Sequence, residues 1–350
     1  MLFYSRMSFH RVVFSSLLSL SLLAVPVLSI GVPSGNLRPD NLDDFAPHPQ
    51  IGKTFNEFWT YTFWLNNGIS VEVNLSRASF GSFKDPVCGA NLSATNFKGK
   101  NYLVAREYKS SNFAFDRNSY RLSIHERIFS EGRPPESHRL FFATTKKGTS
   151  YFLDLTFKEM AQGSVWGDGV FQLPDNQKVA LFFHVPRARV QGRLAIDNDT
   201  LAVQGWGWMD HTWQTHFAPK LIDAGYRYVV PGRVEGGFFF RRDGNLFGYG
   251  LREENGKRIV LHPTGIRTLE KTSWAGINLP LAFEIDFNGA PAVRYRWKEQ
   301  RQSNSAFQEL SSFERWGAKL YIGGDLYGFR GTGTVNDSLP AVFSFTGVKR

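Results

Sequence analysis

The residues best suited to chemistry lie in one short stretch, VQGWGWMDHTWQTHFAP, which runs from Val203 to Pro219. It places the adjacent pair Asp210 and His211 among three tryptophans. A carboxylic acid and an imidazole can act as general acid and base, and an aromatic face stabilises a nearby cation by about 0.5–2 kcal/mol. The stretch therefore combines a candidate acid-base pair with a large aromatic surface.

Strand alternation divides the stretch into two faces, because successive side chains of a β-strand point to opposite sides. One face carries Val203, Gly205, Gly207, Met209, His211 and Trp213, and the other carries Gln204, Trp206, Trp208, Asp210 and Thr212. Asp210 then points away from His211 unless the strand bulges or ends there. Gly205 and Gly207 have no side chain, so another backbone, side chain or ligand can approach that face closely. The plainer alternative is that the tryptophans are core residues and Asp210 caps a loop.

Two further acids stand among aromatic residues. Glu57 shares one face of the strand Phe55 to Trp64 with Trp59 and Tyr61, which is an unusual inward position for a glutamate. Alternatively, Glu57 lies at the exposed start of that strand. Glu235 precedes Gly236-Gly237 and the phenylalanines Phe238 and Phe240, where the alternative is a turn residue.

A resemblance rests on three motifs: the run from His184 to Leu194 (HVPRARVQGRL), Val203-Gln-Gly205, and Asp210-His211-Thr212-Trp213. This series resembles the first domain of the carotenoid 1,2-hydratase/AttH-like family. The resemblance implies two tandem lipocalin-like barrels with a hydrophobic pocket, and it carries His211 and Trp213 over as site residues. The tyrosine and aspartate that the family has on its next strand are missing from Gly236 to Phe240, so the proton donor stays open among Asp210, Glu57 and Glu235.

The implied reaction is hydration of a prenyl or isoprenoid double bond by a secreted hydro-lyase. Protonation of a trisubstituted alkene gives a tertiary carbocation, which water captures, so the chemistry needs no metal or organic cofactor. We expect His211 to orient water and Asp210 or Glu57 to donate the proton. The expected substrate contacts are Trp213, Trp59, Tyr61, Trp208, Phe238 and Phe240. His211 and His216 lack a third ligand at suitable spacing, so no metal site is predicted.

Two other functions remain open. One is a secreted carrier of a hydrophobic ligand without turnover, because small barrels hold one ligand. The other is a lipocalin-like pericyclase, which folds a polyene for cyclisation and gives a product isomeric with its substrate. A hydratase of this kind would detoxify a prenylated isoflavonoid phytoalexin of plants, so the expected partner is a small hydrophobic prenylated phenol or isoprenoid.

The whole chain reads as short strands separated by turns, which is typical of an all-β protein. Two groups of about eight strands predict two barrels, and the resemblance implies that they are tandem lipocalin-like antiparallel β-barrels. We expect a signal peptide over 1–29, a linker over 30–50, an N-terminal barrel over 51–218 and a C-terminal barrel over 219–350.

The first thirty residues indicate secretion. Arg6 and Arg11 precede the leucine-rich run Leu17 to Leu28, no acid occurs before Asp40, and cleavage fits after Ser29. The apolar run is too short for a comfortable transmembrane helix, so no stable membrane anchor is expected. Cys88 is the only cysteine, which leaves stability to core burial. The expected glycosylation sites are Asn74, Asn91, Asn198 and Asn336.

The net charge of +10 comes from scattered basic residues. Because they form no block of five or six, nucleic acid is not an expected partner, although a weak attraction for phenolates remains. The aromatic content of 15% is compatible with a homodimer.

Overall fold

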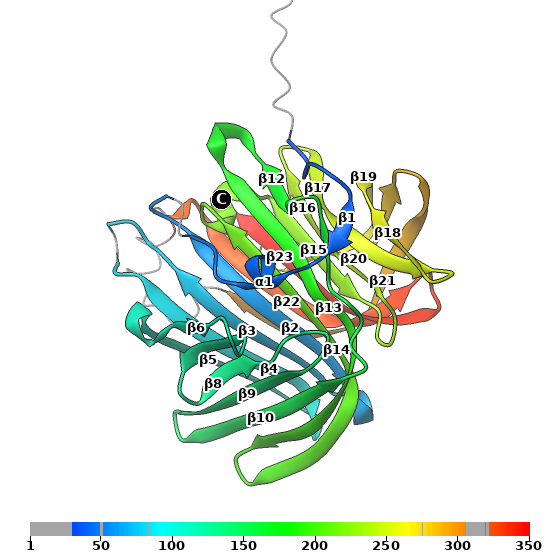
Figure 1. The fold of residues 1–350 in the computed structure, drawn as a ribbon. Coiled ribbons are helices and arrows are strands. Elements are labelled where there is room, and N and C mark those ends of the chain that lie inside the picture. Colours follow the sequence, from blue (N-terminus) through cyan, green and yellow to red (C-terminus); the bar gives the residue numbers. More distant parts are fainter. Residues whose placement is uncertain (1–29, 50–51, 83, 275, 306–318, 320–321) are drawn as a thin grey trace, which may run out of the picture.

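The protein is described by a computed structural model that covers residues 30–49, 52–82, 84–274, 276–305, 319 and 322–350. Nearly all of it is antiparallel β-structure in two sheets (Figure 1). The prediction of an all-β chain with two tandem lipocalin-like units is therefore confirmed. The predicted signal peptide lies outside the described residues.

The first sheet contains 14 strands, more than the eight expected, because five segments of three or four residues also pair. Its order is β5-β4-β3-β2-β14-β13-β10-β9-β8-β7-β6, with β1, β11 and β12 paired beside this path. The strands are β1 Leu37–Pro39, β2 Asn56–Leu65, β3 Ser70–Ala78, β4 Val87–Phe97, β5 Lys100–Lys109, β6 Ala114–Asp116, β7 Arg121–His125, β8 Ile128–Glu131, β9 His138–Lys146, β10 Thr149–Lys158, β11 Ser164–Trp166, β12 Val170–Gln172, β13 Lys178–Ile196 and β14 Asp199–Gln214. Three 3-10 turns join some of them: η1 Asn66–Gly68, η2 Ser110–Asn112 and η3 Pro174–Asn176.

The second sheet contains nine strands in the order β18-β17-β16-β15-β23-β22-β21-β20-β19. The strands are β15 Ala224–Val229, β16 Glu235–Arg242, β17 Asn245–Glu254, β18 Lys257–Leu261, β19 Pro263–Trp274, β20 Ile277–Phe287, β21 Ala290–Ser305, β22 Asp325–Val335 and β23 Leu339–Lys349. The short helix α2, Ala218–Leu221, separates the last strand of the first sheet from the first strand of the second.

Four apolar cores follow from the alternation of the strands, the smallest of which contains Trp213 of β14 with Phe55, Val165, Ala180 and Phe182. Each sheet curls around its own core, and we call the side of a strand that faces this core its inner face. Met209 of β14 belongs to the core of the first sheet, whereas its neighbour Trp208 belongs to a third core between the sheets. Residues next to each other in β14 therefore enter different cores.

The segment 30–50 is folded, so the expected linker is wrong over its described part. β1 pairs with β11, and α1 (Leu42–Phe45) begins at Asn41, whose side chain caps the helix. Phe45 is buried in the core of the first sheet, and its carbonyl accepts a 3.1 Å hydrogen bond from the indole of Trp59. Apolar and acidic residues of this segment, such as Phe45 and Asp40, contact residues of the first sheet. The proline-rich composition of the segment gave no sign of these contacts. We call residues 38–48 the N-terminal strap (dark blue in Figure 1).

Gly205 of β14 shows why glycine stands in this strand. A Cβ atom there would lie 2.1 Å from the carbonyl oxygen of Trp64 on β2, so the backbones approach too closely for any side chain. We expect Gly205→Ala to lower the free energy of unfolding by about 1–3 kcal/mol, as overpacking generally does. Urea unfolding followed by tryptophan fluorescence measures this loss. Gly225→Ala is the control, because its Cβ meets neighbours only at 3.4 Å and beyond; equal effects would contradict the argument.

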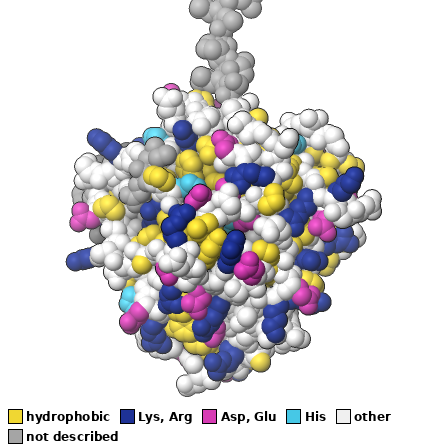
Figure 2. Space-filling model, in the orientation of Figure 1, with side chains coloured by type: hydrophobic (Ala, Val, Ile, Leu, Met, Phe, Trp, Pro, Cys, Tyr) yellow, Lys and Arg dark blue, Asp and Glu magenta, His cyan; other side chains and the backbone are white. Residues whose placement is uncertain are grey.

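Two surface properties bear on partners. No helix among the described residues is long and apolar enough to cross a membrane. On the face in Figure 2, lysine and arginine side chains are spread among aspartates and glutamates and do not gather into one patch.

Candidate active site

A pocket of about 400 Å³ lies between the two sheets. Its walls come from β2, β3 and β14 of the first sheet and from β15, β16, β22 and β23 of the second. Phe58, Phe217, Phe238 and Phe240 give it a largely apolar lining. A volume of this size, enclosed by aromatic rings at a domain interface, is typical of a small-molecule site.

One wall of the pocket is polar and connected by hydrogen bonds. The amide of Asn74 donates to Glu72 Oε1 at 2.8 Å and to Asn91 Oδ1 at 3.2 Å, and it accepts from the hydroxyl of Thr60 at 2.6 Å. Glu72 also forms an ion pair with Arg330 of the second sheet. Among the described residues that line the pocket, Glu72 is the one carboxylic acid.

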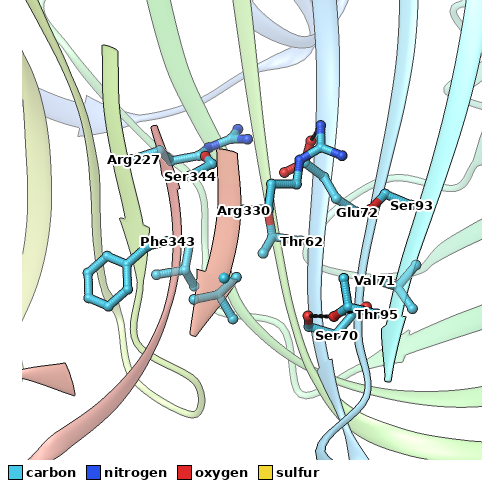
Figure 3. Close-up of a pocket in the computed structure, with 13 residues that line it drawn as sticks. Thr62, Ser70, Val71, Glu72, Ser93, Thr95, Arg227, Arg330, Phe343 and Ser344 are labelled. Atoms are coloured by element: carbon cyan, nitrogen blue, oxygen red, sulfur yellow. Dashed lines mark hydrogen bonds and ion pairs between the residues drawn. The ribbon is translucent and has the colours of Figure 1, made fainter. Parts of the chain in front are cut away.

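A second ion pair joins the sheets next to this wall. Arg227 of β15 contacts Asp210 of β14, and the indole of Trp208 donates to Asp210 Oδ2 at 3.1 Å. Figure 3 shows Arg227 and Arg330 extending from the second sheet, with Glu72 opposite Arg330 on the first. Arg227 lines the pocket, but Asp210 is fully buried behind it. Burial raises the pKa of Asp210, and the positive charge of Arg227 opposes this rise without cancelling it.

A different polar cluster lies on the inner face of the first sheet. Antiparallel pairing of β2 with β14 sets Trp59 opposite His211 and Glu57 opposite Trp213. Glu57 Oε1 lies 2.9 Å from His211 Nε2 and 3.1 Å from His48 Nδ1, and Arg77 of β3 contacts the other carboxylate oxygen. Both Glu57 and His211 are fully buried, so no solvent or ligand touches them.

Charges and hydrogen bonds decide the protonation of this cluster. Burial alone would raise the pKa of Glu57, but its hydrogen-bond contacts with His211 and His48 and the charges of His211 and Arg77 lower it to about 2. Burial lowers the pKa of His211 to about 4, although the bond to Glu57 works in the opposite direction. Glu57 is therefore held as a carboxylate, which makes it unsuitable as a proton donor at neutral pH.

The N-terminal strap completes the cluster. The backbone carbonyl of Asp44 lies 3.0 Å from His211 Nδ1, and His184 Nε2 lies 3.3 Å from the same nitrogen. His184 Nδ1 in turn lies 2.8 Å from the carboxylate of Asp40. Sequence reasoning missed His48, Asp40 and Asp44 because the strap was taken for a linker.

The predicted site residues thus fall into separate groups. Glu57, His211, Trp59, Tyr61 and Trp213 are buried inside the first sheet, as alternation indicated, and Trp59 stacks on His211 with ring centroids 4.5 Å apart. Tyr61 contacts His138, 3.1 Å from its hydroxyl. Asp210 and Trp208 face the second sheet, and Phe238 and Phe240 line the pocket there. His211 and Asp210 therefore cannot act on one substrate together, and this part of the predicted mechanism is wrong.

Glu235 belongs to neither group. It is the first residue of β16 and is buried on the inner face of the second sheet, where Arg252 of β17 donates to it at 2.9 Å. The neighbouring rings of Tyr228 and Tyr295 pack against each other with centroids 4.7 Å apart. Glu235 is thus an ion-paired core residue on the face of β16 opposite to Phe238 and Phe240, which line the pocket.

The four predicted glycosylation sites differ in accessibility. Asn198 and Asn336 lie exposed in turns between strands. Asn74 and Asn91 line the pocket, and the amide nitrogen of Asn74 that would carry the glycan already donates two hydrogen bonds. A glycan at either position would fill the pocket, so the expectation is confined to Asn198 and Asn336.

The charged pocket residues, Glu72, Arg227 and Arg330, were all missed by sequence reasoning. A signal for Glu72 was present, since Ser70, Glu72 and Asn74 alternate with the apolar Val71 and Val73. That pattern indicates a polar face but not that a second sheet covers it. The arginines could not be distinguished from the many exposed basic residues.

Comparisons with known proteins identify solved structures that share this fold. No family model matches the sequence, and no curated protein does. Among solved structures, one from Nitrosomonas europaea with the provisional name AttH superposes with a TM-score of 0.63 at 14% identity, over 87% of this chain and 95% of that one. CghA, solved with Sch210972, gives a TM-score of 0.57 at 13% identity over 90% and 98% of the two chains.

Kievitone hydratase from Nectria haematococca gives a TM-score of 0.51 at 12% identity, over 91% of this chain and 95% of that one. At such identities the likeness shows a shared fold. The tandem lipocalin-like architecture expected from the AttH-like resemblance is therefore confirmed. Fold and site together define a pair of lipocalin-like units with an aromatic-lined pocket between them.

Proposed function

We propose that this protein is a hydratase that binds a prenylated phenol between its two sheets and adds water to the prenyl double bond. The observation that carries the proposal is the aromatic pocket beside Asp210, a buried acid with a raised pKa. A carboxyl group that stays protonated at higher pH than usual is the donor that alkene hydration requires. The shared fold with kievitone hydratase supports the same class of reaction.

The pocket suits an amphipathic ligand. Phe58, Phe217, Phe238 and Phe240 offer a surface for the prenyl tail, and Arg227 and Arg330 offer positive charge to a phenol oxygen. A prenylated isoflavonoid such as kievitone combines both parts. Its hydration would give a more polar tertiary alcohol, in keeping with detoxification of a plant phytoalexin.

The proposed reaction balances without a co-reactant other than water. Asp210 transfers its proton to the less substituted alkene carbon, and the tertiary carbocation forms against the aromatic wall. Water adds to the cation, and the resulting oxonium returns one proton to the Asp210 carboxylate. Because Arg227 stands between Asp210 and the pocket, its guanidinium must turn toward the ligand oxygen before the proton is transferred.

Mass spectrometry in oxygen-18 water tests the proposal. The purified protein is incubated with kievitone and other prenylated isoflavonoids, and we expect a product heavier by one labelled water. An unlabelled product of unchanged mass but altered retention would identify a pericyclase. Unchanged ligand with saturable binding would identify a carrier, which the full burial of Asp210 favours as the second candidate.

Removal of one aromatic wall should weaken binding whichever of these functions holds. Phe238 lines the pocket and packs against Arg227, whose Cζ lies 5.5 Å from the ring centroid. We expect Phe238→Ala to raise the ligand Kd about 10- to 100-fold, since burying such a ring contributes about 1.5–3 kcal/mol. Fluorescence titration with the isoflavonoid measures this change. Phe141→Ala, on β9 outside the pocket lining, is the control and should bind like the unaltered protein.

Secretion and glycosylation belong to the same proposal. We expect the chain to leave a eukaryotic host cell with glycans at Asn198 and Asn336 only. Peptide mapping of protein from the culture medium, with and without glycosidase, checks both points. A glycan on Asn74 would contradict the pocket as described.

A further inference from the structure

Three side chains from separate segments of the chain present their coordinating atoms to one point inside the first sheet. They are His48 Nδ1, Glu57 Oε1 and His211 Nε2, and these atoms all lie within 4.8 Å of one another. The strap supplies His48, β2 supplies Glu57 and β14 supplies His211. Two imidazoles and one carboxylate form a common ligand set for zinc in proteins.

The hydrogen bonds around His211 indicate that a cation belongs at this point. A carbonyl oxygen only accepts, so the contact of 3.0 Å to Asp44 places the proton of a neutral His211 on Nδ1. The lone pair of Nε2 then faces Glu57 Oε1 at 2.9 Å, and two acceptors at that distance need a positive centre between them. Either an additional proton on His211 or a metal ion meets that need.

The surroundings match those of a metal site. Histidine ligands usually donate their other ring N–H to a carbonyl or carboxylate, as His211 does to Asp44, and ligating carboxylates carry their own hydrogen bonds. Arg77 binds Glu57 Oε2, and Glu57 Oε1 accepts from the backbone N–H of His48 at 2.9 Å while it also faces the two imidazoles. The ring of Trp59 stacks on His211 with planes 19° apart and holds its orientation.

An entry route exists on the side of the strap. The His48 side chain keeps 20% of its surface exposed, whereas those of Glu57 and His211 are fully buried. A metal ion can therefore reach the cluster from the side of His48. The ligands come from three separate segments, so a bound ion would tie the strap to β2 and β14.

We propose that His48 Nδ1, Glu57 Oε1 and His211 Nε2 bind one zinc ion that anchors the N-terminal strap to the first sheet. The site lies on the inner face of β14, opposite to the proposed substrate pocket, and does not depend on the proposed hydratase activity. A bound ion would cross-link the strap to the sheet and stabilise the folded state. This chain has one cysteine and cannot form an internal disulfide for that purpose. The sequence concealed the site because His48 lay in the supposed linker.

Metal titration of the tag-free, chelator-treated mature protein tests the proposal. We expect calorimetry with zinc to give one ion per chain with a micromolar or tighter Kd, and cobalt to give the visible absorption of a tetrahedral centre. Zinc should also raise the thermal midpoint of the unaltered protein. No binding, or binding of zinc without a rise in the midpoint, would overturn the inference.

Variants locate the ion. His48→Gln alters the partly exposed ligand and is expected to fold, to lose the cobalt absorption and to weaken zinc binding at least 100-fold. His262→Gln, a half-buried histidine of the second sheet region, is the matched control and should behave like the unaltered protein. Equal zinc affinity in His48→Gln, or an equal loss in His262→Gln, would overturn the assignment.

Discussion

Asp210→Asn is expected to lower kcat for alkene hydration by about 10²- to 10⁴-fold, the usual contribution of a general acid. The amide keeps the size of the side chain but has no acidic proton to transfer. Turnover is measured by the gain of labelled water, and ligand binding is measured separately by fluorescence titration. Binding should stay within a few-fold, because Asp210 does not line the pocket.

Asp210→Asn also leaves Arg227 without its buried counterion, so a control must separate lost stability from lost catalysis. Asp210→Asn combined with Arg227→Gln removes both charges and should restore folding stability without restoring turnover. Asp286→Asn, an exposed member of an ion pair with Arg267, should have normal kcat. Full activity of the Asp210→Asn protein would remove Asp210 from the mechanism and leave the pocket without its donor.

The same assignment predicts a pH profile. Because the reactive form of Asp210 is protonated, kcat/KM should fall as pH rises through the pKa of this carboxyl. Burial raises that pKa above the ordinary value of an aspartate, so the fall should come at correspondingly higher pH. A rate that increases with pH over the same range would contradict a protonated donor.

Glu57→Gln is expected to lower the free energy of unfolding by about 3–5 kcal/mol, the typical cost of breaking a buried ion pair. Glu57 receives hydrogen bonds from His48 and Arg77 and contacts His211, and a neutral amide cannot balance the charge of Arg77. Urea unfolding in the presence of a chelator isolates this effect from metal binding. Glu107→Gln, an exposed partner of Lys84, should change stability by less than about 1 kcal/mol.

Acid should act on the unaltered protein in the same direction. The pKa of Glu57 falls from 4.5 to about 2 on folding, so its stabilisation is present above pH 4.5 and is lost as pH falls toward 2. The pKa of His211 falls from 6.5 to about 4, so protonation of the unfolded chain also removes stability below pH 6.5. The Glu57→Gln protein should therefore show a shallower loss between pH 4.5 and 2; an unchanged slope would contradict the role of Glu57.

Much of the architecture could be predicted because its signals are local. Short strands with frequent turns identified an all-β chain, and the break near Pro219 coincides with α2 between the sheets. Several three-residue strands, such as β1 and β11, were missed because so short a stretch carries no periodicity. The strap was misread for a related reason: its stability comes from contacts of Phe45 and Asp44 with the sheet rather than from its own sequence pattern.

By itself, the sequence determined which face each residue of β14 and β2 occupies. The two-residue period of a strand put Asp210 and His211 on opposite sides, and it put Glu57 with Trp59 and Tyr61. Only the tertiary structure decided which partners those faces meet. Pairing of β2 with β14 joins residues 154 positions apart, and contact between the sheets brings Arg227 to Asp210. Such contacts depend on strand register and on the packing of distant segments, which no local pattern encodes.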